Sequence, residues 1–140
     1  MKNEKNLNKK GSALPIAIIV GILIISMSAI LISTITNEVY IRKGTEERVK
    51  AKYIAEAGIE NGIYLYNLKV KNNESIKENF SHRDSVGDLG NYYLEYNPPL
   101  ENSNIAIFYS TGITKDNKSI KMQAKLDTSN GRILSWDELK

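Results

Sequence analysis

The chain has 140 residues and 15.7 kDa, contains no cysteine and carries a formal net charge of +3. The absence of cysteine excludes disulfides, zinc–thiolate sites and thiol catalysis. Residues 1–11 hold four lysines and one glutamate, which account for the whole net charge, because the remaining residues carry 15 basic and 15 acidic side chains. A basic tip without a basic domain argues against direct binding of nucleic acid.

Residues 11–37 carry no charge, and residues 13–32 are almost entirely apolar. Twenty residues at a helical rise of about 1.5 Å cover roughly 30 Å, the thickness of a bilayer's hydrocarbon core. This length predicts a transmembrane helix over residues 12–36 rather than a buried helix of a soluble protein. A cleaved signal peptide is the other alternative, but its apolar region would be about 7–15 residues long and end in an A-x-A-like site. The residues after Ile32 have no such site, so we expect the segment to be retained.

A second helical pattern follows over residues 37–68, where small and apolar residues recur at i, i+3, i+4 and i+7 and form one stripe. Glycine inside a helix costs about 1 kcal/mol relative to alanine, so Gly58 and Gly62, one and two turns after Ala55, need a packing reason. The partner is this chain's own sheet, the helices of neighbouring subunits, or each of them along different parts of the stripe. The stripe comprises Ala51, Ile54, Ala55, Gly58, Ile59, Gly62, Ile63 and Tyr66.

The remaining residues, 69–140, predict a loop followed by a small sheet. Residues 69–90 are polar and rich in turn formers, which indicates mainly loop. Alternating or aromatic runs predict strands at 92–96, 105–113, 120–126 and 132–136, with turns at 116–117 and 129–131. The expected fold is therefore α+β: a long N-terminal helix, transmembrane in its first half and amphipathic in its second, packed on an antiparallel sheet of about four strands.

The sequence offers no catalytic or metal-binding pattern. His82 is the only histidine, and it is predicted to lie in a solvated loop between Ser81 and Asp84. Adjacent residues cannot form a triad, because their side chains diverge. The carboxylates lack metal-ligand spacing, and there is no glycine-rich phosphate loop. We therefore expect no enzymatic activity, no cofactor and no metal.

Two segments carry a resemblance to a known family. A short basic leader ends in Lys9-Lys10-Gly11 and is followed directly by Ser12-Ala13-Leu14 at the start of the apolar run, and residues 55–60 read AEAGIE. Together these segments resemble the type IV pilin-like proteins, and specifically the PilX N-terminal-domain group, with a tail similar to that of minor pilins of Gram-positive bacteria. The resemblance is strong over about residues 9–66 and loose over the sheet.

The resemblance implies a processing and assembly route. A prepilin peptidase would cut between Gly11 and Ser12 on the cytoplasmic face and methylate the amine of Ser12, which sets the N-terminus inside. An assembly ATPase and a platform protein would then move the single-pass chain from the cell membrane into an extracellular pilus with other pilins. Many family members have a glutamate at the fifth residue after the cut, where this chain has Ile16. That departure favours a minor or initiating subunit.

The function expected from the sequence is thus a minor pilin or pilin-like subunit in the assembly or initiation of a type IV pilus. Its organisation would be a leader (1–11), a transmembrane helix (12–36), an amphipathic continuation (37–68) and the loop and sheet (69–140). One alternative is a pseudopilin of type II secretion or competence. The other is an uncleaved bitopic membrane anchor for a small extracytoplasmic binding domain.

Overall fold

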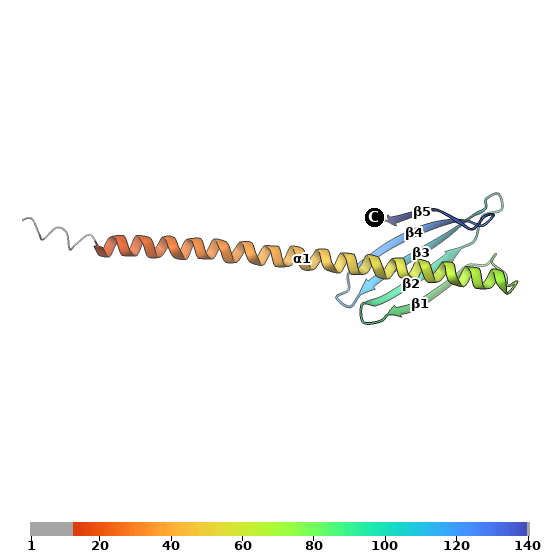
Figure 1. The fold of residues 1–140 in the computed structure, drawn as a ribbon, viewed down its shortest axis with the longest axis horizontal. Helices are drawn as coiled ribbons and strands as arrows, with labels where there is room; N and C mark the ends of the chain where they lie inside the picture. The colour runs from red at the N-terminus through yellow and green to blue at the C-terminus, as the bar shows by residue number, and fades with distance from the viewer. Residues whose placement is uncertain (1–12, 140) are drawn as a thin grey trace, which may run out of the picture. The chain divides into compact units, whose positions relative to one another are not determined.

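The computed structural model describes residues 13–139, which form one helix and five strands (Figure 1). The chain divides into two compact units, Met1–Lys43 and Gly44–Lys140. The helix begins in the first unit, and its remainder lies with all five strands in the second. The elements are α1 (Ala13–Lys71), β1 (Phe80–Val86), β2 (Gly90–Asn97), β3 (Ile105–Thr114), β4 (Ser119–Asp127) and β5 (Arg132–Leu139).

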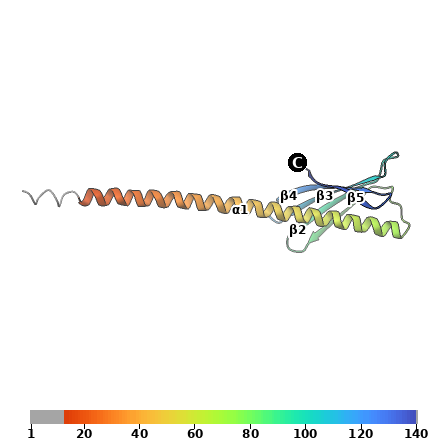
Figure 2. The same ribbon diagram turned by 45° about the horizontal axis from the view of Figure 1, so that its top comes forward.

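The five strands form a single antiparallel meander in the order β1-β2-β3-β4-β5. The part of α1 within the second unit lies across one face of this sheet, as both ribbon views show (Figures 1 and 2). A sheet covered on one face buries every second residue of its strands. The predicted α+β class, a long N-terminal helix packed on a small antiparallel sheet, is confirmed.

The sheet has one strand more than the sequence predicts, because β1 occupies part of the expected loop. Its seven residues pair with β2 from Phe80 opposite Tyr96 to Val86 opposite Gly90. β1 is an edge strand whose residues are exposed or half-buried. Its sequence therefore lacks the alternation of apolar and polar residues that indicates a half-buried strand. His82 therefore lies in a strand and is half-buried, rather than in a solvated loop.

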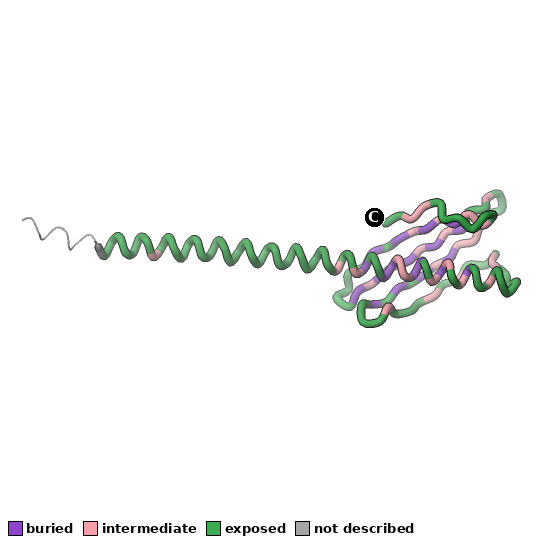
Figure 3. Tube along the Cα trace, in the orientation of Figure 1, coloured by how far each residue is buried: buried purple, intermediate pink, exposed green. Residues whose placement is uncertain are grey.

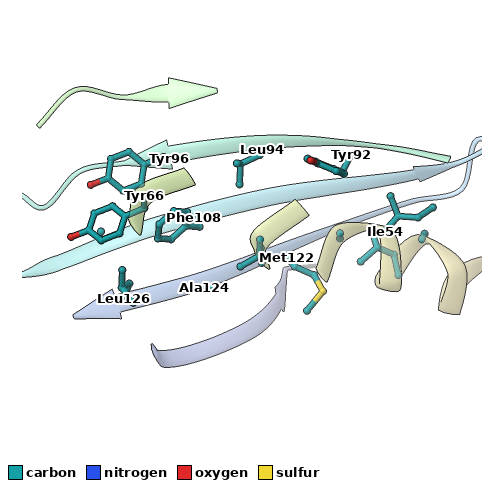
Figure 4. Packing of buried hydrophobic residues seen from close by; sticks show 14 residues of the cluster. Ile54, Tyr66, Tyr92, Leu94, Tyr96, Phe108, Met122, Ala124 and Leu126 are labelled. Carbon is teal, nitrogen blue, oxygen red and sulfur yellow. The ribbon is translucent and has the colours of Figure 1, made fainter. Parts of the chain in front are cut away.

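The core lies between α1 and the three central strands (Figure 4). Burial alternates along β2, β3 and β4, which is visible as alternating colours in Figure 3. The predicted helical stripe is buried apart from Ile63, which is half-buried. The buried apolar residues of the strands are Tyr92, Leu94, Tyr96, Ala106, Phe108, Ile120, Met122, Ala124 and Leu126.

α1 ends three residues later than the predicted boundary at Leu68, and a local hydrogen-bond motif ends it. Asn73 takes a left-handed conformation with φ of 54°. Its N–H donates to the carbonyl oxygen of Val70 at 3.2 Å, and the N–H of Glu74 donates to that of Lys69 at 2.9 Å. This pairing is a Schellman motif, in which asparagine can replace the usual glycine.

The phenol of Tyr96 makes the unit sensitive to high pH. Its side chain is fully buried, its hydroxyl donates to the carbonyl oxygen of Ile76 at 3.0 Å, and burial raises its pKa to about 12. An unfolded tyrosine loses its proton near pH 10. Stability is therefore fully present below about pH 10 and falls as the pH rises towards 12, because the unfolded chain releases a proton that the folded chain retains.

We expect Tyr96→Phe to flatten this alkaline loss of stability, by at most about 1.4 kcal/mol per pH unit, while costing some stability at neutral pH through the lost hydrogen bond. Urea unfolding at several pH values between 8 and 12, followed by the fluorescence of the single tryptophan, Trp136, measures both effects. Tyr64→Phe is the matched control, because that tyrosine is 62% exposed. An alkaline slope that Tyr96→Phe leaves unchanged would contradict this assignment.

Candidate functional site

The first unit presents an apolar surface that nothing in the described chain covers. The helix is long enough and apolar enough to span a membrane, and none of its most apolar window is buried. From Leu14 to Ile41 the large apolar side chains are all exposed, and this segment is almost entirely green in Figure 3. Contiguous apolar surface of this extent is rare on soluble monomers and marks contact with lipid or with another protein.

Four hydroxyl groups in this part of α1 form hydrogen bonds within the helix. Ser26 and Ser28 donate to the carbonyl oxygens of Ile22 and Ile24, both at 2.8 Å. Thr34 and Thr36 make the same bond four residues back, at 3.0 and 2.8 Å. An unpaired polar group in hydrocarbon costs several kcal/mol, so this bonding removes the penalty that these four hydroxyls would otherwise incur in lipid.

The predicted processing residues, Gly11 and Ser12, lie outside the described residues. Ile16, where the resemblance to pilin-like proteins led us to look for a glutamate, lies on α1 with 59% of its surface exposed. The three predicted helix-packing residues, Ala55, Gly58 and Gly62, all face the chain's own sheet. A Cβ on Gly58 would lie 2.8 Å from the ring of Tyr92, and one on Gly62 would lie 2.7 Å from a methyl group of Leu94.

Gly112 is a close-approach position that the sequence analysis did not identify. It lies on β3, and a Cβ there would overlap the carbonyl oxygen of Ala51 and lie 2.5 Å from the backbone nitrogen of Ala55. Helix and strand therefore meet backbone to backbone at this point. A glycine inside an alternating strand pattern indicates close approach of another backbone. The position of Gly112 within the predicted strand at residues 105–113 was therefore a sequence signal for this contact.

Charged pairs flank the joint between helix and sheet. Arg48 on α1 donates to the Glu138 carboxylate on β5 at 2.8 Å, and this hydrogen bond holds the pKa of Glu138 below its usual value. Lys50 contacts the carboxylates of Glu46 and Glu47 at 2.7 and 2.9 Å, and its hydrogen bonds to them raise its pKa. Surface pairs of this kind contribute little to stability, but the first links α1 to the edge of the sheet.

The described residues of the second unit form surface hollows. Residues 13–139 contain no group of histidines and carboxylates that could hold a metal ion. A hollow of ≈ 540 Å³ lies beside Ile76, Pro98, Pro99 and Leu100. A smaller one of ≈ 180 Å³, here called the β1–β2 pocket, is lined by Asn79, Ser81, Tyr93, Glu95 and Asn97, with Phe80 and Tyr96 completing it.

The described parts of the chain thus provide an apolar helix, a tightly packed helix–sheet joint and two surface hollows. Comparison with known proteins found no matching family model, no matching curated protein and no matching solved structure.

Proposed function

We propose that this chain is a minor pilin or pilin-like subunit that takes part in the assembly or initiation of a type IV pilus. The proposal rests on the two parts of helix α1. Its first part is exposed, uncharged and apolar, and its last part packs on the antiparallel sheet. The resemblance of residues 9–66 to pilin-like proteins supports the same conclusion.

A pilin subunit needs an apolar segment that can lie in the membrane and later leave it for the filament. Residues 13–37 carry no charge, and charged side chains begin at Glu38, close to the aromatic Tyr40, which is 73% exposed. Tyrosine and charged residues are typical of the membrane–water boundary. In a filament, apolar helices of neighbouring subunits would replace lipid, so the apolar residues would stay out of water in both states.

The packed part of α1 also retains apolar side chains on the side away from the sheet. Val49, Tyr53 and Tyr64 recur at helical spacing and are 44%, 63% and 62% exposed. A helix that only covers its own sheet needs no apolar residues there. Neighbouring pilin subunits would supply the partner surface for these side chains. Ile16, in place of a glutamate, favours a minor subunit present in few copies over one that repeats throughout the filament.

Processing at Gly11 and Ser12 is the expectation with the clearest test. We expect the protein from native membranes to begin at an N-methylated Ser12, and to keep all eleven leader residues in a strain that lacks the prepilin peptidase. Intact-protein mass spectrometry of both strains distinguishes the two forms. A peptidase-independent N-terminus with the leader intact would overturn the proposal and leave a bitopic anchor for a small extracytoplasmic domain.

A strain that lacks the gene for this chain distinguishes the pilus from a secretion or competence pseudopilus. Deletion of the gene for a minor pilin should reduce surface pili seen by electron microscopy while leaving secreted enzymes and DNA uptake unchanged. Normal piliation with lost secretion or uptake would instead assign the chain to a pseudopilus.

A further inference from the structure

We propose that the β1–β2 pocket binds a neutral saccharide, one sugar ring at a time. Apart from Phe80 and Tyr96, the residues that line the pocket lie outside the core between α1 and the sheet. Residues alternate between the faces of a strand, and Tyr92, Leu94 and Tyr96 are buried under α1. Tyr93, Glu95 and Asn97 therefore lie on the opposite face of β2, where Ser81 of β1 pairs with Glu95 in register.

The polar groups of the pocket have hydrogen-bonding capacity to spare. Glu95 is half-buried, and its carboxylate has no hydrogen bond or ion pair with any residue in the range 13–139. The side-chain nitrogen of Asn79 donates to the side-chain oxygen of Asn97 at 3.4 Å, which is a long bond. An oxygen of Asn79 and a nitrogen of Asn97 are left as acceptor and donor. A ligand rich in hydroxyl groups can use carboxylate, amide and Ser81 hydroxyl together.

Tyr93 supplies the apolar component. Its side chain is 41% exposed at the wall of the pocket, so part of the ring is open to a ligand. A sugar ring presents C–H groups on its faces and hydroxyl groups around its rim. An aromatic ring for the C–H groups, surrounded by a few polar side chains that fix orientation, is the combination that such a ligand requires.

The size and charge of the pocket favour a small neutral ligand. A volume of ≈ 180 Å³ lies below the roughly 300 Å³ at which pockets for drug-sized ligands begin, which suits a single sugar ring. Its lining contains no lysine or arginine and one carboxylate, which disfavours phosphate and acidic sugars. A site for a quaternary ammonium group needs a cage of aromatic rings, and only one lining tyrosine is substantially exposed.

Saturation-transfer difference NMR on the full chain tests the proposal. The protein is held in a zwitterionic detergent, because detergents with sugar head groups would compete for the pocket. The probes are glucose, galactose, mannose and N-acetylglucosamine, with glucuronate and choline as charged comparisons. We expect at least one neutral sugar to bind with a dissociation constant of roughly millimolar size, as the few contacts of a single ring allow.

Three variants locate the binding. Tyr93→Ala should weaken it by about tenfold or more, because the contact surface for the ring is lost, and Glu95→Ala should weaken it by a similar factor. Tyr53→Ala is the control: this tyrosine lies on α1 outside the pocket and is 63% exposed, so its removal should leave sugar binding unchanged. The urea midpoint followed by Trp136 fluorescence verifies that each variant is folded.

Three outcomes would overturn the proposal. The first is the absence of a transfer signal for all four neutral sugars. The second is binding that both Tyr93→Ala and Glu95→Ala leave unchanged while the chain remains folded. The third is tighter binding of glucuronate or choline than of every neutral sugar. None of these outcomes bears on whether the chain is processed and assembled as a pilin, because all residues that line the pocket lie in the second unit and none of them belongs to the leader or the apolar helix.

Discussion

Gly112→Ala is expected to lower the free energy of unfolding of the Gly44–Lys140 unit by about 3 kcal/mol or more. The added methyl group would overlap the carbonyl oxygen of Ala51 and lie 2.5 Å from the backbone nitrogen of Ala55. A crowded side chain can change its rotamer, but these neighbours are backbone atoms of α1. The helix must therefore move away from β3, which loosens the contacts of buried residues along its whole packed face.

Urea unfolding of the full chain, followed by Trp136 fluorescence, measures this loss as a lower midpoint with an unchanged slope. Gly44→Ala is the matched control, because no atom lies within 4 Å of a Cβ at that helical glycine. It should raise stability by about 0.5–1 kcal/mol through the better helix propensity of alanine. A Gly112→Ala chain that unfolds at the wild-type urea concentration would show that helix and strand are not in backbone contact.

Sequence patterns predicted the parts of the fold that are half-buried and regular. The stripe from Ala51 to Tyr66 repeats at helical spacing because one side of α1 faces the sheet. In β4, Ile120, Met122 and Leu126 alternate with polar residues because only one face of the sheet is covered. Where only one side of an element is buried, the spacing of its apolar residues indicates both the type of element and the face that is buried.

The patterns failed where burial is weak or where a close contact has no side chain. β1 lies at the edge of the sheet, and between Phe80 and Val86 it has no apolar residue that would distinguish it from a loop. At Gly112 the backbone of α1 lies where a Cβ would otherwise be, and a hydropathy pattern does not show such a contact. The β1–β2 pocket brings Asn79 next to Asn97, and this pairing depends on a hairpin that was not predicted.

The structure identifies neighbours for the two glycines in the packed part of α1. The sequence required a packing partner for Gly58 and Gly62 but left open whether this was the chain's own sheet or another subunit. The structure places Gly58 against Tyr92 and Ser110, and Gly62 against Leu94 and Phe108. Both glycines are used within the unit, so contacts with neighbouring subunits would fall on other faces, such as that of Val49, Tyr53 and Tyr64.

Replacing both Ile24 and Ile25 by lysine is expected to prevent stable insertion of the chain into the membrane. The two residues lie at the middle of the predicted span, and their side chains are 60% and 70% exposed. A lysine at the centre of a transmembrane helix costs about 2.5–3.5 kcal/mol, and each replaced isoleucine gives up roughly 0.5 kcal/mol more. The total loss of insertion free energy is about 6–8 kcal/mol, which is too large for a single segment to lose and still insert stably.

Alkaline carbonate extraction of native membranes measures the effect as a shift of the double variant from the pellet to the soluble fraction. Val39→Lys together with Tyr40→Lys is the matched control, since these lysines would join the charges that begin at Glu38, and it should stay in the pellet. Trp136 fluorescence separates failed insertion from misfolding, because the tryptophan lies in the second unit and reports on its sheet. Should the Ile24 and Ile25 variant resist extraction like the wild type, residues 12–36 would not span the bilayer, and the exposed apolar run would have to be covered by protein instead.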